Sequence, residues 1–269
     1  MSNNYNNLNN HLSIEMGGGF SFLLKCGRSQ KDIVDFEMHG NPSSHSFRDF
    51  MEVPLHSGLF SEKYTSVNVA WCNGKFNLIP DALYAENAQE DLLRLNAELD
   101  EQDAIGIMDL PAIQAKLIYA YPAQVASAVR KVHPMTKEGH ILGYFIQSTF
   151  SLEKNGNTVF LHFLPGQMLV VAYSEKGLAL ANIFPAKDPQ DCLYYALFCC
   201  EQLQFTQQNT RFHVSGEINR NSQLSDLFEK YTTGLNYVDL APGIGNKGQV
   251  SLLPGHRLLT LTEQFKCAL

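Results

Sequence analysis

Apolar residues along the chain follow a strand–turn–strand–turn–strand pattern, and this pattern occurs twice. In the clearer copy, residues 158–184, a Pro-Gly pair and a Lys-Gly pair separate three apolar runs. In the earlier copy, residues 12–38, apolar and polar residues alternate on both sides of three consecutive glycines at 17–19. A period of two is typical of strands, and Pro-Gly or Gly-Gly pairs are typical of turns. The pattern therefore predicts two three-stranded antiparallel meanders.

Helices and further strands are predicted after each meander. In the first half, an Asn-Gly pair at 73–74 predicts a hairpin, and helical spacing covers residues 122–133 and 141–148. In the second half, residues 189–205 form a predicted helix that is apolar over a wide arc and should be well buried. A strand, a helix and another strand are predicted at 211–214, 224–231 and 236–240.

The repeated order predicts a duplicated α/β fold with mixed sheets and a cleft between its two halves. The periodicity breaks at the Lys-Asn-Gly-Asn run 154–157, which places the halves at residues 11–155 and 156–269. Residues 1–10 include six asparagines, and we expect them to form a disordered polar tail.

Composition narrows the function classes. The formal net charge of −7 disfavours non-specific binding to nucleic acid or to an anionic membrane. No apolar run approaches the ~18 residues of a membrane helix, and the first ten residues lack the features of a secretory signal. The six cysteines show neither C-x-x-C nor zinc-finger spacing, which favours buried structural thiols. We therefore expect a cytoplasmic protein that binds no nucleic acid and does not insert into a membrane.

Meander, helix, strand, helix, strand is the order of the ribonuclease-H-like unit, and two such units in tandem resemble the actin-like ATPase fold. The second half also resembles an uncharacterised bacterial family, domain-of-unknown-function family 3822, whose fold is actin-like. The first half matches this family more loosely, at 12–14 and 78–83. The resemblance implies two ribonuclease-H-like halves and implies no reaction. Its clearest blocks are Leu-Ala-Asn-Ile-Phe at 180–184, Asp-Cys-Leu-Tyr-Tyr-Ala-Leu at 191–197, His-Val-Ser-Gly-Glu-Ile at 213–218 and Phe-Glu-Lys-Tyr at 228–231.

An actin-like nucleotide site needs a glycine turn from each half around the phosphates and an acid for Mg²⁺. In the resemblance, Glu15 stands near that acid and the three glycines after Met16 form the first phosphate turn. The Pro165-Gly166 turn corresponds to the second, and a Ser-Gly pair after Val214 corresponds to the segment that approaches the adenosine. The candidate cleft residues are therefore Glu15, Gly17, Gly18, Gly19, Gly166, Ser215 and Gly216.

Each of these positions also has an ordinary structural interpretation. Glycines supply positive φ in hairpin turns, and Glu15 would then be solvated on the strand face opposite Ile14. In the second half, His162 stands where the resemblance implies an acid, and neutral imidazole is a poor ligand for Mg²⁺. Ser215 stands where glycine is usual, and its side chain would keep the backbone farther from a nucleotide.

Two of the three nucleotide elements are thus altered. This favours a non-catalytic module that binds an unknown protein partner, with no catalytic residues, no metal and no cofactor. The alternative is a nucleotide-binding protein, or an ATPase- or phosphotransferase-like enzyme, that uses ATP and Mg²⁺ with altered phosphate-turn residues. A third class, nucleic-acid processing by a ribonuclease-H-like half, needs several convergent carboxylates on metal ions. Only Glu15 is a visible candidate for such a carboxylate in the predicted strands.

Overall fold

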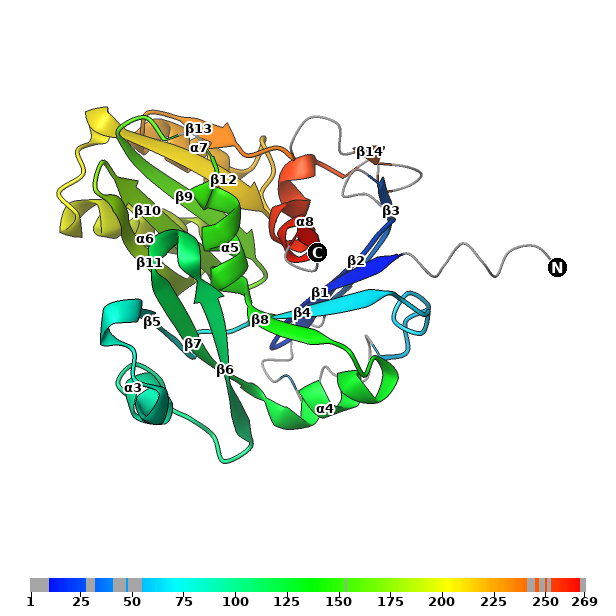
Figure 1. Ribbon diagram of the computed structural model, residues 1–269. Helices are drawn as coiled ribbons and strands as arrows, with labels where there is room; N and C mark the ends of the chain where they lie inside the picture. Colours follow the sequence, from blue (N-terminus) through cyan, green and yellow to red (C-terminus); the bar gives the residue numbers. More distant parts are fainter. Residues whose placement is uncertain are drawn as a thin grey trace. The chain divides into compact units, whose positions relative to one another are not determined.

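The computed structural model describes residues 10–27, 32–40, 47, 55–152, 154–240, 245–246, 250 and 253–266 (Figure 1). The chain forms two compact units. Unit 1 comprises residues 1–144, 242–253 and 260–269, and unit 2 comprises residues 145–241 and 254–259. The predicted polar tail lies outside the described residues except for Asn10. The predicted boundary at 155/156 separates the sequence repeats rather than the compact units, and it stays a prediction.

Among the described residues, the main sheet of unit 1 has six strands in the order β14-β3-β2-β1-β4-β8. The first three strands in the chain form the predicted antiparallel meander, and β4 and β8 then add parallel to β1 and to β4. The strands are β1 His11–Gly17, β2 Phe20–Cys26, β3 Asp32–Gly40, β4 Ser66–Cys72, β8 Lys137–His140 and β14 Gly245–Asn246.

A smaller antiparallel sheet in unit 1 has the order β5-β7-β6. Strand β5 follows β4 across the Asn-Gly turn but pairs with β7 in this separate sheet, so the prediction of a hairpin at 73–74 is wrong. Pro122 ends β7 and is the N-cap of the helix that follows it. The strands are β5 Phe76–Pro80, β6 Asp103–Leu110 and β7 Ala115–Pro122, and the helices are α3 Gln89–Arg94, α4 Ala123–Val132, α5 Ile141–Phe150, which begins in unit 1 and continues into unit 2, and α8 Leu259–Lys266.

The two faces of the main sheet in unit 1 differ in polarity. One face packs against α4 through an apolar cluster that includes Ile14 and the only tryptophan of the chain, Trp71. The opposite face carries His11, Glu15 and Asn68, which are all buried. This difference follows from the pleat, which sends alternate side chains of a strand to opposite faces.

Unit 2 repeats the same strand arrangement. Its sheet has the order β11-β10-β9-β12-β13, with an antiparallel meander followed by two strands that add parallel to β9 and to β12. This is the order and the polarity of β3-β2-β1-β4-β8 in unit 1. The strands are β9 Asn157–Leu164, β10 Gln167–Ser174, β11 Gly177–Pro185, β12 Thr210–Gly216 and β13 Leu235–Tyr237, and the helices are α6 Pro189–Gln202 and α7 Gln223–Tyr231.

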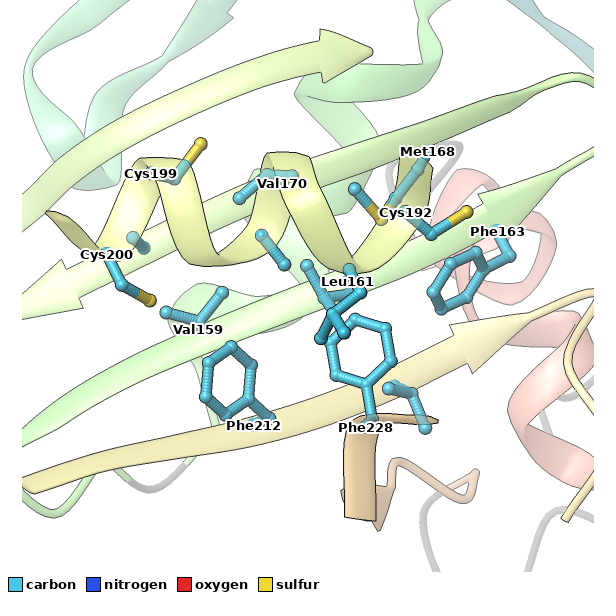
Figure 2. Packing of buried hydrophobic residues seen from close by; sticks show 14 of the residues in the cluster. Val159, Leu161, Phe163, Met168, Val170, Cys192, Cys199, Cys200, Phe212 and Phe228 are labelled. Atoms are coloured by element: carbon cyan, nitrogen blue, oxygen red, sulfur yellow. The ribbon is translucent and has the colours of Figure 1, made fainter. Parts of the chain in front are cut away.

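The core of unit 2 lies between one face of this sheet and the helices α6 and α7 (Figure 2). Leu161 and Phe212 from the sheet, Phe228 from α7, and Cys192 and Cys200 from α6 belong to this cluster. All five cysteines within the described residues are free and buried, which agrees with the expectation of structural thiols.

Helix α6 departs from the prediction of nearly complete burial. The predicted helix 189–205 ends as α6 at Gln202, and one side of it is open to solvent. Tyr194 is 61% exposed and Phe198 is 41% exposed. The sequence alone did not separate these aromatic residues from the buried ones, because both kinds are apolar.

The duplication extends to single positions within the two meanders. Glu15 stands two residues before the end of β1, and His162 stands two residues before the end of β9. In each strand the flanking residues, such as Ile14 and Leu161, belong to the apolar cluster on the other face of the sheet. The predicted duplicated α/β fold with mixed sheets is therefore confirmed.

Candidate functional site

The Glu15 side chain lies on the polar face of the main sheet in unit 1, where it is buried with 1% of its surface exposed. The interpretation of Glu15 as a solvated strand residue is therefore wrong. Residues next to it on the same face include Phe22 of β2 and Ala70 of β4, which are its partners in the strand register. A buried carboxyl group needs hydrogen-bond partners, because isolation of a polar group from water is costly.

Helix α8 supplies such a donor. The Thr260 hydroxyl donates a hydrogen bond to Glu15 Oε1 over 2.5 Å, and Thr260 is itself fully buried. One turn later, the Gln264 carbonyl oxygen accepts a hydrogen bond from Asn68 Nδ2 over 2.6 Å. The residues of α8 that lie in unit 1 therefore pack along β1 and β4 and close over the carboxylate.

His11 completes this polar face at the start of β1. Its Nδ1 lies 2.8 Å from Ser66 Oγ, its Nε2 lies 3.0 Å from Ser13 Oγ, and its ring packs on Phe265 of α8 at a centroid distance of 5.0 Å. Burial, and next the positive charge of Lys137, lower the pKa of His11 to about 4. The imidazole is therefore neutral at physiological pH.

Two of the three glycines of the first turn, Gly17 and Gly19, are explained by the hairpin itself. A Cβ atom on Gly17 would lie 2.2 Å from the Phe20 ring, so glycine is needed for this ring to pack on the strand. Gly19 has φ of 124°, which is strained for residues with a side chain, and its N–H donates to the Gly17 carbonyl oxygen. Gly18 lies between them in the same turn.

In unit 2, His162 occupies the position equivalent to Glu15. It is fully buried, and its Nδ1 lies 2.9 Å from the Ser215 hydroxyl, which is its neighbour on β12. Burial, and next the charge of His256, lower the pKa of His162 to about 3, so the ring is neutral at physiological pH. Ser215 is thus a buried hydrogen-bond partner of the histidine.

The two glycines predicted in unit 2 have local causes as well. Gly166 has φ of 76° in the turn between β9 and β10, as expected for the second residue of a Pro-Gly turn. Gly216 has φ of 83°, and a Cβ atom there would lie 2.1 Å from the Phe163 carbonyl oxygen on β9. The backbone of β12 therefore approaches β9 too closely for any residue other than glycine.

The segment after Gly216 is fixed by 3₁₀ helix η7, Gly255–Leu258. Arg257 forms a two-pronged ion pair with Glu217, with Nε 2.8 Å from Oε1. The ring nitrogen Nε2 of His256 lies 2.9 Å from the Ile218 carbonyl oxygen. The turn that follows β12 in unit 2 is therefore held by side chains of η7, which belongs to the same unit.

The donor positions in the two units do not suit Mg²⁺. This ion prefers oxygen ligands and keeps several of its waters, so its ligand needs open space. Glu15 is enclosed and accepts a hydrogen bond from Thr260, and His162 offers a buried nitrogen. Among the described residues, no group of three or more His, Cys, Asp or Glu side chains could hold a metal ion.

The structure groups the predicted site residues by unit. Glu15 and the three glycines share the first hairpin, whereas Gly166, Ser215 and Gly216 lie on β9–β10 and β12 of unit 2. A single nucleotide site formed by both sets stays a prediction. Sequence reasoning missed Thr260, because a threonine on a helix carries no motif and its partner lies 245 residues away.

Solved structures with a similar backbone identify the fold. A Bacteroides thetaiotaomicron VPI-5482 protein, described as having an actin-like ATPase fold and unknown function, is 19% identical with a TM-score of 0.77; the match covers 88% of this chain and 94% of that chain. The PilM–PilN type IV pilus biogenesis complex matches at 10% identity and TM-score 0.60 over 96% of this chain and 98% of that chain. The chain therefore has the actin-like ATPase fold, as the sequence predicted.

A third similar structure is the cytoplasmic domain of EpsL, an inner-membrane component of the type II secretion system of Vibrio cholerae. It is 10% identical with a TM-score of 0.52, and the match covers 97% of this chain and 96% of that chain. At such identities these likenesses show the fold alone.

The chain itself belongs to the family described as protein of unknown function (DUF3822), whose family model matches residues 2–235. This confirms the family resemblance seen in the sequence. No curated protein matches the chain. In the part of the chain that the structure describes, no helix has the length and apolar character needed to cross a bilayer.

Proposed function

We propose that this protein is a non-catalytic, cytoplasmic bacterial module that uses an actin-like fold to bind another protein. The buried Glu15 carboxylate carries the proposal. In the actin-like arrangement implied by the sequence, this position should face a hydrated metal ion. Here the carboxylate accepts a hydrogen bond from Thr260 and is closed off by α8. A side chain that α8 covers is a poor binding group for a solvated Mg²⁺–nucleotide complex.

The glycines support the same conclusion. In a nucleotide site, glycines allow the backbone to approach the phosphates, and their presence would favour ATP binding. Gly17 and Gly216 instead leave space for Phe20 and for the Phe163 carbonyl group. Because packing within each unit already requires these glycines, they need no nucleotide to explain them.

Two of the similar structures support an interaction role. One is described as the PilM–PilN complex, and another as a domain of a type II secretion component. Proteins with this fold therefore occur in multi-protein assemblies, and we infer a comparable role for this chain. The five buried free thiols among the described residues support a reducing compartment, hence the cytoplasm.

Isothermal titration calorimetry with ATP and ADP in the presence of Mg²⁺ tests the non-catalytic role. We expect no binding up to about millimolar nucleotide and no phosphate release. Glu15→Ala should behave like the parent protein, and Glu101→Ala, at an exposed glutamate of the same unit, is the matched control. Micromolar binding together with hydrolysis that only Glu15→Ala abolishes would overturn the proposal in favour of an ATPase with altered phosphate turns.

A further inference from the structure

Helix α6 presents a row of aromatic side chains to solvent on the surface of unit 2. Tyr194 and Phe198 stand one helical turn apart, and their rings stack with centroids 6.0 Å apart and planes at 17°. Aromatic residues exposed together are unusual on a protein surface and mark interaction sites. Neither ring contributes to the core cluster of unit 2.

An open apolar pocket of about 410 Å³ lies beside this row. Leu197 and Cys200 of α6 and Phe205 just after it form one side, while Phe212 of β12 and Tyr231 of α7 contribute the rest of the apolar lining. Tyr231 is itself 43% exposed. A pocket of this size and lining can receive a large apolar side chain.

The C-terminal end of α6 shapes this pocket. Gln204 has φ of 56°, and its N–H donates to the Glu201 carbonyl oxygen, while the Phe205 N–H donates to the Cys200 carbonyl oxygen over 2.8 Å. These two bonds form a Schellman motif, which reverses the chain after a helix. The motif holds Phe205 against Cys200, so this wall of the pocket is set by backbone geometry and is present before any partner binds.

The charge of this surface is negative on the α6 side. The only charged residues between 188 and 205 are Asp188, Asp191 and Glu201. Glu201 lines the pocket and lies in the last turn of α6, which contains no basic residue. The C-terminal end of a helix carries partial negative charge, so a carboxylate there favours an approaching cation. Lys230, over the Tyr231 ring, lies on the α7 side of the pocket.

We propose that this surface, formed by Tyr194, Phe198, Glu201 and the pocket, binds a basic amphipathic helix of a partner protein. This inference rests on the proposed interaction role and names the class of its partner. A large apolar side chain of the partner enters the pocket. A Lys or Arg one turn away on the same face lies against Glu201 and the C-terminal end of α6. Residues three or four apart share a helix face, so one short helix supplies both groups.

A second copy of this chain is a poor occupant of the surface. In a two-fold symmetric dimer the same patch faces itself, which brings the two acidic sides of α6 together. Like charges placed opposite each other oppose association. The net charge of −7 acts in the same direction.

Panning the whole protein against a displayed library of random 16-residue peptides tests this proposal. We expect enriched peptides to carry a large apolar residue and a Lys or Arg three or four positions apart. Their affinity, measured by fluorescence polarisation, should fall about tenfold or more on Tyr194→Ser or Phe198→Ser. Leu83→Ser, at an exposed leucine of unit 1, is the matched control and should leave affinity unchanged.

Charge reversal provides the second arm of this test. Glu201→Lys should weaken binding of the basic peptides about tenfold or more. Failure to enrich peptides, enrichment of acidic peptides, or binding that is indifferent to the three α6 substitutions would overturn the docking proposal. Self-association by sedimentation velocity that Phe198→Ser abolishes would also overturn it, in favour of a second copy. Nucleotide calorimetry reports separately on the non-catalytic role, so the two proposals can fail independently.

Discussion

The hydrogen bond between Thr260 and Glu15 can be measured with a double-mutant cycle. Thr260→Val keeps the shape of the side chain and removes the hydroxyl, and Glu15→Met removes the carboxylate at similar volume. Both side chains are buried and their oxygen atoms are 2.5 Å apart. A buried hydrogen bond contributes about 1–3 kcal/mol to stability. We therefore expect a coupling free energy of about that size, with Thr260→Val costing far less in the Glu15→Met background.

Trp71 makes this cycle specific to unit 1. It is the only tryptophan of the chain, it is fully buried in the apolar cluster of that unit, and its ring stacks on Tyr121 with centroids 5.5 Å apart. Its fluorescence during urea unfolding therefore follows the sheet that carries Glu15. A coupling free energy below about 0.5 kcal/mol would refute the reasoning, because independent sites add within that margin. Glu15 would then lack an energetic link to α8, and the main support for a closed carboxylate would be lost.

Three further predictions concern two backbone positions and the buried His11. Gly216→Ala should destabilise the protein by about 3 kcal/mol or more in urea unfolding. The Cβ atom of the alanine would lie 2.1 Å from the Phe163 carbonyl oxygen, and the backbone φ at this position is 83°. An unfolding midpoint equal to that of the parent protein would contradict this packing. Gln204→Gly should stabilise the protein by about 1 kcal/mol, because glycine adopts the left-handed conformation of the Schellman motif without strain. A loss of stability would mean that the Gln204 side chain itself stabilises the fold. Burial lowers the pKa of His11 from 6.5 to about 4, so the contribution of neutral His11 to the free energy of unfolding is complete above pH 6.5 and declines as the pH falls towards 4. His11→Asn should reduce the slope of the free energy of unfolding against pH in this range by about 1.4 kcal/mol per pH unit. An unchanged slope would refute this assignment.

The meanders could be predicted because their strands obey simple periodicity. In β1 and β2, apolar residues recur at every second position, and a run of three glycines begins at the end of β1 and continues through the turn. Local geometry decides such hairpins, so the residues that form them are close in sequence. Strand β8 was missed for the opposite reason: Lys137–His140 is short and shows no apolar alternation, and it becomes a strand through parallel pairing with β4. Parallel pairing depends on partners far away in the chain.

The exposed row on α6 could not be predicted from apolar content. A helix that is apolar over a wide arc is ordinarily buried on most sides, and this rule led to the wrong expectation for residues 189–205. Cys192 and Phe198 look equally apolar in the sequence, yet only Cys192 faces the sheet. Which side of a helix is covered depends on the number and the position of the elements packed on it, and in unit 2 these are the sheet and α7.

The candidate site separates what local sequence can indicate from what it cannot. The residue types at the two turns already pointed away from Mg²⁺, since His162 replaces an acid and Ser215 a glycine. Glu15 instead favoured a Mg²⁺ site, because a carboxylate beside a glycine turn is the expected ligand of that ion. Its environment is decided by Thr260, which is 245 residues distant and reaches the sheet only after unit 2 has been traversed. A carboxylate in a strand is therefore a ligand or a buried hydrogen-bond acceptor according to what covers it, and the sequence near Glu15 does not contain that information.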